Sequence, residues 1–361
     1  MRKIVFYINC IANGGAERVI SNLANQMDSA GCECIMVTSF RTPVEYPLNE
    51  GVKRYSLSDE KISESRLQKI ISLVHRLRKI VKQEKPDIVV SFMAEPNYRA
   101  LLATAFLKTK NLISVRTDPV REYPGKVGYI LSRVLLPTTD GCVFQTEDAR
   151  KWFSESLQKK SRVIFNPVKA DFFRTERKPV KDRILMFGRL TDKKNNMLAV
   201  DAVKMLKDKY PGMQLLMYGE GPLEQEINDH IRAEGMEDTA KLMGRTENVP
   251  EWHSTADVFI LPSKFEGAPN SLMEALAMGI PSVSSDCPCG GPKMLIDNME
   301  NGILVPVDDT KALADAVDTL LGDEELRRTM SEKAKKRSVE FDPEKVFESW
   351  KEYIELLTKE Q

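Results

Sequence analysis

Residues 257–281 read DVFILPSKFEGAPNSLMEALAMGIP, and this stretch decides the fold class. Val258–Leu261 predicts a short buried strand, and Asn270 predicts the N-cap of the helix that follows it. Glu266 lies in the connecting loop, and Glu274 lies about one turn inside the helix. Free N–H groups at a helix N-terminus attract phosphate. Two carboxylates beside such a site suit a ligand with both phosphates and hydroxyls, such as a nucleotide sugar.

The same order of strand, loop and helix continues along the chain in both directions. A single glutamate in such a pattern is usually a solvated surface charge. Glu266 and Glu274 therefore indicate a binding site only if the surrounding sequence supports one. An alternation of strands and helices predicts parallel sheets covered on both faces, with ligands bound beyond the carboxyl ends of the strands. The predicted strands are Ile4–Ile8, Ile35–Thr38, Ile88–Ser91, Leu112–Val115, Cys142–Gln145, Ile184–Phe187, Gln214–Tyr218, Val258–Leu261 and Pro281–Ser284, and the helices of the first half are Ala16–Met27, Ser63–Gln83, Tyr98–Leu107 and Arg121–Leu135.

A chain of 361 residues exceeds what one hydrophobic core usually organises, so we expect two domains. Residues 1–167 form the first Rossmann-like domain, and residues 168–182 form a polar linker with two prolines nearby. Residues 183–341 form the second domain. Residues 342–361 form a long final helix with an apolar face.

The composition is that of an ordinary globular protein, with 42% apolar and 29% charged residues. No apolar run approaches the roughly 18 residues that a membrane-spanning helix needs. The first apolar run, Ile4–Ile8, is too short for a signal peptide and reads as a strand. We therefore expect a cytoplasmic protein, peripheral at most to the inner face of the cell membrane.

Six cysteines are few for this length and indicate reduced thiols. Two pairs, Cys32 with Cys34 and Cys287 with Cys289, leave a gap of one residue, whereas structural zinc sites usually leave two to four. No metal site is therefore predicted.

The net charge of zero conceals an asymmetry between the two halves. Residues 1–174 contain 28 Lys and Arg against 18 Asp and Glu, and the remainder contains 25 against 35. The predicted helix Ser63–Gln83 alone carries six basic residues, together with aliphatic residues that include Ile70, Ile71, Leu73, Leu77 and Ile80. Such a helix packs on a core with a solvated basic face, or it lies against an anionic membrane surface. We expect the basic half to contact a membrane surface, and no nucleic-acid partner.

Three further segments give residues 257–281 their context. The first is Gly14-Gly15-Ala-Glu-Arg, at the first predicted turn from strand to helix. The second is Gly188-Arg189-Leu190-Thr-Asp-Lys-Lys194-Asn195, and the third is Tyr218-Gly219-Glu-Gly221-Pro-Leu. With Glu266 and Glu274 as an E-x7-E pair, they resemble in order and spacing the retaining GT-B glycosyltransferases of glycosyltransferase family 4. The resemblance covers essentially the whole chain and implies two doubly wound Rossmann-like domains that face each other across a cleft.

The resemblance, together with the chemistry of the side chains, assigns roles in glycosyl transfer. Negative charge grows on the departing diphosphate, so the fork of Arg189 and the point charge of Lys194 suit catalysis there. By resemblance, Glu266 contacts the donor sugar near its anomeric carbon, and Glu274 accepts hydrogen bonds from the ribose. The other expected donor-binding residues are Gly14, Gly15, Gly188, Gly219, Gly221, Arg245, Val249, Ala268, Pro269, Asn270, Ser271 and Leu272.

A divalent cation held by an Asp-x-Asp motif is the usual alternative for neutralising a diphosphate. The sequence contains no Asp-x-Asp triplet. We therefore expect a reaction without a metal or any other cofactor, with the nucleotide sugar as a substrate.

The loop after Leu112–Val115 departs from the family pattern, in which many members carry a histidine. Here the loop reads Ser114-Val-Arg116-Thr-Asp118-Pro, so Arg116 or Asp118 is the candidate to replace it near the acceptor or the donor sugar. No general base is assigned, because the leaving phosphate oxygen of a retaining enzyme can take the proton of the acceptor.

Three functions remain open. The favoured one is a retaining, metal-independent transfer of a hexose or N-acetylhexosamine from a nucleotide-diphospho-sugar, a UDP-sugar above all, to a polyprenyl-diphosphate-linked glycan. A related enzyme could act on a soluble acceptor or epimerise a nucleotide sugar. A non-catalytic scaffold that binds nucleotide sugars is the third. A dinucleotide oxidoreductase fits less well, because the first turn lacks the spacing G-x-G-x-x-G.

Overall fold

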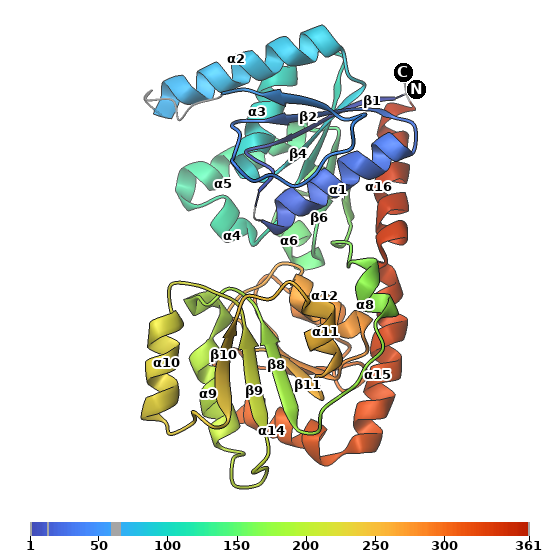
Figure 1. Cartoon of the computed structure of the whole chain (residues 1–361). Coiled ribbons are helices and arrows are strands. Elements are labelled where there is room, and N and C mark those ends of the chain that lie inside the picture. The colour runs from blue at the N-terminus through green and yellow to red at the C-terminus, as the bar shows by residue number, and fades with distance from the viewer. Residues whose placement is uncertain (1, 13, 59–65, 360–361) are drawn as a thin grey trace. The chain divides into compact units, whose positions relative to one another are not determined.

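The computed structural model describes residues 2–12, 14–58 and 66–359 (Figure 1). The chain divides into two compact units, residues Met1–Asn166 with Val346–Gln361 and residues Pro167–Lys345. Each unit contains a parallel sheet with helices packed on its faces. The predicted fold class of two doubly wound α/β domains is confirmed.

In the described part of the first unit, a sheet of seven strands runs in the order β3-β2-β1-β4-β5-β6-β7. The strands are β1 (Lys3–Ile8), β2 (Glu33–Thr38), β3 (Lys53–Ser56), β4 (Ile88–Phe92), β5 (Lys110–Ser114), β6 (Gly141–Phe144) and β7 (Ser161–Val163). The helices are α1 (Gly15–Ser29), α2 (Arg66–Glu84), α3 (Ala94–Thr104), α4 (Pro119–Glu122), α5 (Gly125–Val134), the 3-10 turn η1 (Leu136–Thr138), α6 (Glu147–Lys151), α7 (Glu155–Gln158) and most of α16 (Pro343–Thr358).

Alternate residues of each strand of this sheet pack into two separate cores. Ile4 and Phe6 of β1 face a core that includes residues of α1 and α16. Val5 and Tyr7 of the same strand face a core that includes residues of α2 and α3. This is the period of two expected for a strand that is buried on both faces.

The final helix α16 packs on the first sheet through aromatic residues. Trp350 stacks on Phe92 of β4 with 5.5 Å between ring centroids. The hydroxyl of Tyr353 accepts a hydrogen bond from the backbone N–H of Cys142 at 3.2 Å and donates one to the carbonyl of Lys160. The helix therefore belongs to the unit that begins the chain, although it follows the second unit in sequence.

In the described part of the second unit, six strands run in the order β10-β9-β8-β11-β12-β13. They are β8 (Arg183–Phe187), β9 (Gln214–Tyr218), β10 (Ala240–Gly244), β11 (Val258–Leu261), β12 (Ser282–Ser285) and β13 (Ile303–Val305). The helices are α8 (Ala170–Arg174), η2 (Asp192–Lys194), α9 (Asn196–Lys204), α10 (Glu224–Ala233), α11 (Val249–Ser254), α12 (Asn270–Ala277), α13 (Gly291–Leu295), α14 (Thr310–Gly322), α15 (Glu324–Ser338) and η3 (Val339–Phe341). One core of this unit includes apolar residues of α9, α10 and α14.

The sequence analysis did not predict four strands, and these are the edge strands of the two sheets. They are β3 and β7 in the first sheet and β10 and β13 in the second. Three of these strands are only three to five residues long and contain polar residues, as Lys53–Ser56 does. An edge strand is covered less completely than a central one, so its sequence need not be an apolar run.

Several predicted helix bounds were wrong. The helix predicted over residues 121–135 is broken into α4 and α5, because Pro124 lacks an N–H to continue it. The helix predicted from Tyr98 begins at Ala94. Asn270 is the first residue of α12 and not its N-cap, a position that Pro269 occupies. The predicted residues Ser63–Ser65 lie outside the described part of the chain, where α2 begins at Arg66.

Residues 168–182, which the sequence analysis assigns to a linker, include α8 and bond to the second unit. The backbone N–H groups of Lys178 and Val180 donate to the carbonyls of Ser254 and Thr255 at 2.8 and 2.9 Å. The guanidinium of Arg177 donates to the carbonyls of Gly279 and Ala256. Among the helices that the structure describes, none combines the length and the apolar character needed to cross a membrane.

Candidate active site

The candidate site of the second unit lies in three loops at the carboxyl ends of neighbouring strands. The loop after β8 begins at Gly188, the loop after β9 begins at Gly219, and the loop after β11 contains Glu266. In open parallel sheets, ligands bind at this edge. The structure thus brings together, within one unit, the segments that the sequence analysis singled out there.

Glycines allow the first two loops to touch through their backbones. A Cβ atom on Gly219 would lie 1.9 Å from the carbonyl oxygen of Gly188, and one on Gly221 would lie 2.1 Å from that of Leu190. Gly219 also has φ of +141°, which side chains disfavour. The N–H of Leu190 donates to the carbonyl of Glu220 at 3.0 Å, which joins the two loops.

Glu266 is 5% exposed and its carboxylate binds two lysines. Its Oε1 lies 2.8 Å from Nζ of Lys194, and its Oε2 lies 2.8 Å from Nζ of Lys193. Burial raises the pKa of Glu266, but the charges of Lys194 and Lys193 outweigh that effect and hold the pKa below its usual value. Glu266 is therefore a buried carboxylate that stays ionised at neutral pH.

The neighbours of Glu266 fix its place in the loop. Its backbone N–H donates to the carbonyl of Pro288 at 2.7 Å, and its carbonyl accepts from the N–H of Cys289 at 3.1 Å. The next residue, Gly267, lies so close to Gly291 that a Cβ atom on Gly291 would be 1.4 Å from its carbonyl oxygen. The segment after β12 thereby supports the loop that carries Glu266.

The loop after β8 also bonds to the loop that carries Glu266. The N–H of Lys264 donates to the carbonyl of Lys193 at 2.9 Å, and its ammonium pairs with Asp192 at 2.6 Å. Gly188 leaves room for Lys194, since a Cβ atom there would lie 2.6 Å from Cε of that lysine. Both lysines that hold Glu266 are therefore positioned by backbone contacts.

Arg189 differs from the two lysines because its side chain is exposed. Within the described residues, its guanidinium has no hydrogen-bond or ion-pair partner. A planar guanidinium that is free in this way can form a bidentate contact with a phosphate group.

Helix α12 places the remaining predicted residues of this loop. Ala268 and Leu272 are buried, and Asn270, Ser271 and Glu274 are half-buried. The buried residues Leu272, Met273 and Leu276 anchor the helix. Its first turn begins four residues after Glu266, and Glu274 lies in its second turn.

The predicted base-binding residues lie one strand further along the sheet. Gly244 ends β10 with φ of +68°, and its carbonyl accepts from the N–H of Gly219 at 2.9 Å. Arg245 follows with an exposed side chain, and Val249 is the first residue of α11. Both therefore lie at the same edge of the sheet as the loops after β8 and β9.

The sequence analysis missed the buried aromatic stack beneath these loops. Phe187 at the end of β8 stacks on Tyr218 at the end of β9 and on His253 of α11, with centroid distances of 4.6 and 4.1 Å. Burial lowers the pKa of His253 to about 4, so the ring is neutral at physiological pH. It packs in the interior and supports the loops from below.

The sequence analysis also missed Lys193 as a partner of Glu266. The signal was present in the pair Lys193-Lys194, since two adjacent lysines can bind both oxygens of one carboxylate. The family pattern marks only the second of these positions.

The predicted residues of the first unit lie at the carboxyl edge of the first sheet. Gly14 and Gly15 begin α1, after β1. Arg116 follows β5 and is 9% exposed, with its guanidinium 4.6 Å from the ring centroid of Phe92 and donating to Asn166. Burial lowers the pKa of Arg116 to about 10, which leaves it protonated at neutral pH.

Asp118 has a local structural task in the same loop. Its Oδ1 accepts the N–H of Val120 at 3.0 Å and caps α4. Glu122, four residues on, was not singled out from the sequence. It accepts the N–H groups of Arg116 and Thr117 at 3.0 and 3.1 Å, and burial raises its pKa to about 7 against these opposing contacts.

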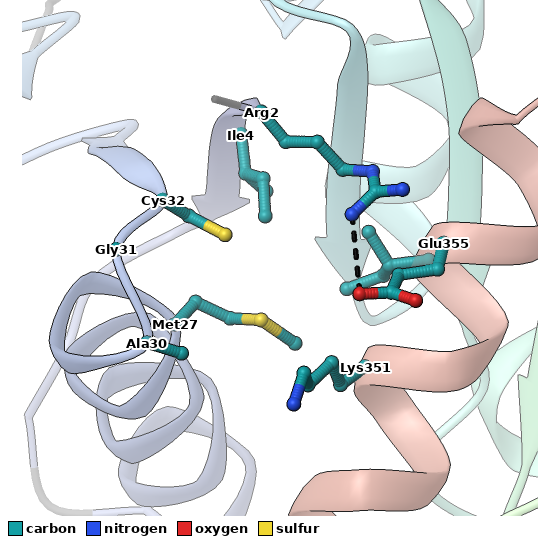
Figure 2. A pocket seen from close by; sticks show the side chains of 9 residues that line it. Arg2, Ile4, Met27, Ala30, Gly31, Cys32, Lys351 and Glu355 are labelled. Carbon is teal, nitrogen blue, oxygen red and sulfur yellow. Dashed lines mark hydrogen bonds and ion pairs between the residues drawn. The ribbon is translucent and has the colours of Figure 1, made fainter.

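One cavity of the first unit, of about 180 Å³, contains none of the predicted site residues (Figure 2). It lies at the amino end of β1, between the end of α1 and the last turns of α16. Arg2 and Glu355 form an ion pair of 3.1 Å at its wall, and Cys32 faces it from the loop after α1. The cavity is therefore at the edge opposite to the one where α/β sheets bind ligands.

The two halves of the chain match two family models. The family model of the group 1 glycosyl transferases matches residues 168–337, and that of glycosyltransferase family 4 matches residues 13–172. The solved structure of Anabaena Alr3699/HepE in complex with UDP has a TM-score of 0.79 at 15% identity, covering 98% of this chain and 99% of that one.

Two enzymes of Campylobacter jejuni are similar over nearly their whole length. The GalNAc-alpha-(1->4)-GalNAc-alpha-(1->3)-diNAcBac-PP-undecaprenol alpha-1,4-N-acetyl-D-galactosaminyltransferase is 30% identical, with 98% of each chain covered. The N-acetylgalactosamine-N,N'-diacetylbacillosaminyl-diphospho-undecaprenol 4-alpha-N-acetylgalactosaminyltransferase is 28% identical, with 98% of this chain and 100% of the relative covered. The chain thus belongs to the family 4 glycosyltransferases, with two Rossmann-like domains of the GT-B type.

Proposed function

We propose that this glycosyltransferase moves a hexose or N-acetylhexosamine from a UDP-sugar to a polyprenyl-diphosphate-linked glycan, with retention of configuration and without a metal. The observation that carries the proposal is the buried carboxylate of Glu266 held between Lys193 and Lys194. The exposed Arg189, which has no side-chain partner among the described residues, belongs to the same loop as the two lysines. A nucleotide sugar is the ligand that needs a carboxylate for its hydroxyls and cations for its diphosphate.

The cations act on the leaving group. Lys194 has three donors and uses one on Glu266, so two remain for the diphosphate. Arg189 can contact two phosphate oxygens at once. As the bond between the anomeric carbon and the diphosphate oxygen breaks, charge grows on that oxygen, and preorganised cations stabilise it more in the transition state than in the ground state. They thereby supply the charge that a divalent ion supplies in other enzymes.

The carboxylates act on the sugar and the ribose. Glu266 stays ionised, so it accepts hydrogen bonds from donor sugar hydroxyls and faces the positive charge that develops at the anomeric carbon. The new bond forms between that carbon and the acceptor oxygen on the face that the diphosphate leaves. The acceptor proton passes to the departing phosphate oxygen, and UDP is released. Glu274 accepts from the ribose hydroxyls.

The acceptor class rests on the relatives, since the two Campylobacter jejuni enzymes carry diphospho-undecaprenol glycans in their names. The UDP donor rests on the complex of a structural neighbour with UDP. Arg116 and Asp118 stay the candidates for acceptor contact in the first unit; Asp118 also caps α4, and Arg116 also donates to Asn166.

The first test is calorimetric titration with UDP in the presence of EDTA, with GDP as a second ligand. We expect micromolar UDP binding in the wild type and its loss in Lys194→Ala. Lys311→Ala is the matched control, because Lys311 is 72% exposed on α14 and pairs only along its own helix in the described structure. Binding that requires a metal, or Lys194→Ala binding like wild type, would contradict the proposal.

The second test measures transfer itself. Purified protein is mixed with single UDP-sugars and a short-chain polyprenyl-diphosphate glycan, and the anomeric configuration of the product is read by NMR. A product with the configuration of the donor supports retention. Transfer only to soluble sugars, or interconversion of the nucleotide sugar, would support the related enzymes considered from the sequence. UDP binding with no reaction of any donor would support the scaffold.

A further inference from the structure

Helix α5 of the first unit turns its apolar residues outward. Val127, Ile130, Leu131 and Val134 are 72, 56, 40 and 67% exposed. Their spacing of i, i+3, i+4 and i+7 places them on one stripe of the helix. In a helix that packs on a core, such a stripe faces inward. Here the buried residue of the helix is Ser132, so the usual arrangement is reversed.

The inner side of α5 is held by small and polar contacts. The hydroxyl of Ser132 donates to the carbonyl of Tyr129, and the hydroxyl of Tyr98 on α3 donates to the carbonyl of Gly128 at 3.4 Å. The guanidinium of Arg133 lies over the rings of Tyr129 and Trp152 at 4.8 and 5.0 Å from their centroids. The contacts with Tyr98 and Trp152 join the helix to the rest of the unit, while the residues of the apolar stripe stay exposed.

The preceding helix α4 adds one exposed apolar residue, and two basic residues lie between that residue and the stripe in the sequence. Val120 is 60% exposed on α4. Arg121 has a side chain 58% exposed and lies 3.8 Å from the carboxylate of Asp118, and Lys126 is also exposed; the two flank the break between the two helices. Glu122, the one acidic residue of positions 119–135, binds backbone N–H groups of its own loop. The exposed charged residues next to these apolar residues in the sequence are therefore basic.

The exposed apolar residues and their basic neighbours together indicate which kind of partner this surface binds. Monomeric proteins rarely expose a contiguous apolar patch of this kind without a use for it. Basic residues beside exposed apolar residues match a bilayer with anionic headgroups, because the apolar side chains enter the acyl region while the cations meet lipid phosphates.

We propose that α5 and Val120 form the surface by which this protein lies on an anionic lipid bilayer, with Arg121 and Lys126 at the headgroups. The inference rests on the proposed function, because the lipid-linked acceptor is the reason for the protein to bind a bilayer. The lipid contact itself stands on the exposed stripe.

Helix α2, the basic helix that the sequence analysis favoured for a membrane contact, has the ordinary arrangement. Leu73, Leu77 and Val81 face the core that includes β1 and β2. Of its basic residues, Lys79 and Lys82 are exposed, whereas Arg76 and Arg78 donate to backbone carbonyls of Leu57 and of Ala103 and Ala105. Ile71 is exposed to 60% as a single apolar side chain. Such a face adds long-range attraction to anionic lipid but has no stripe to insert.

The test is sedimentation of the full chain with vesicles of phosphatidylglycerol and phosphatidylethanolamine, and with vesicles of phosphatidylcholine alone. We expect binding to the anionic vesicles and at least tenfold weaker binding of the double variant Ile130→Asp, Val134→Asp, because each charge opposes insertion. Ile71→Asp is the matched control at similar exposure and should bind within about twofold of wild type. The double variant Arg121→Gln, Lys126→Gln should lose affinity most at low salt.

Two results would overturn the inference. One is equal vesicle binding of the α5 variant and Ile71→Asp. The other is absence of vesicle binding together with a dimer in solution that the α5 variant dissociates, which would make the stripe a contact between two copies. UDP titration of the same proteins separates the two proposals. Vesicle binding without UDP binding supports the lipid surface and contradicts the proposed function. UDP binding without vesicle binding contradicts the lipid surface and leaves the proposed function supported.

Discussion

Two glutamates, the buried Glu266 and the half-buried Glu122, lie at the carboxyl edges of the two sheets and have opposite electrostatic surroundings. Glu266 in the second unit binds two ammonium groups, and their charges hold its pKa below the usual value in spite of burial. Glu122 in the first unit binds backbone N–H groups, and burial raises its pKa to about 7. The difference shows that one edge is organised around a permanent charge and the other around a carboxyl that titrates near neutrality.

The largest expected effect is on Glu266. Glu266→Gln removes the charge but keeps the shape, so we expect transfer to fall by about 100- to 1,000-fold while UDP still binds. Glu226→Gln, an exposed carboxylate on α10 of the same unit, is the control and should keep full activity. A Glu266→Gln enzyme with the wild-type rate would remove Glu266 from the reaction.

The next effect concerns the backbone contact that supports the charged edge. Gly219→Ala places a Cβ atom 1.9 Å from the carbonyl oxygen of Gly188 at a φ of +141°, so we expect a loss of about 3 kcal/mol or more in the free energy of unfolding. Gly212→Ala meets no atom within 4 Å and should change stability by less than about 0.5 kcal/mol. Chemical denaturation measures both. Equal stabilities would mean that the loops do not need this contact.

Glu122 predicts a dependence of stability on pH. Its pKa is about 7 in the folded protein and near 4.5 otherwise, so the unfolded chain releases the proton first as pH rises. The stabilising contribution is complete below about pH 4.5 and is lost as pH rises through 7. Glu122→Gln should therefore flatten the fall in unfolding free energy between pH 5 and 8 by about 1–3 kcal/mol. An unchanged slope in denaturation curves would show that Glu122 is ionised throughout.

The smallest effect concerns Lys193. Lys193→Met removes one of the two cations at Glu266, so the pKa of Glu266 rises and the acid limb of the activity profile should move upward by up to about one pH unit. Lys193→Arg should restore the limb. Lys264→Met, which breaks the pair with Asp192 on the same two loops, is the control that should leave the limb in place. A profile that moves equally in both methionine variants would assign Lys193 to loop packing alone.

The fold class could be predicted from the sequence because the central strands are apolar runs between helices. The four edge strands could not, since residues such as Lys53–Ser56 are covered too little to need an apolar pattern. Pro124 signals the break between α4 and α5 in the sequence, but the prediction of one helix over residues 121–135 did not take it into account.

The residues of the candidate site could be placed on loops from their spacing, but their contacts could not. That Lys193 binds the second oxygen of Glu266 depends on how the loops after β8 and β11 meet. Glu122 reads in the sequence as one more charge on an amphipathic helix. Its raised pKa arises from burial, which depends on the elements packed around it.

The return of α16 to the first sheet sets an order for synthesis on the ribosome. The second unit is one continuous segment, so all of its described contacts become available once residue 345 has been made. The first unit waits for residues 346–359, because Trp350 stacks on Phe92 and Tyr353 bonds to Cys142 and Lys160. The half of the protein that is translated first is therefore the half whose core is completed last.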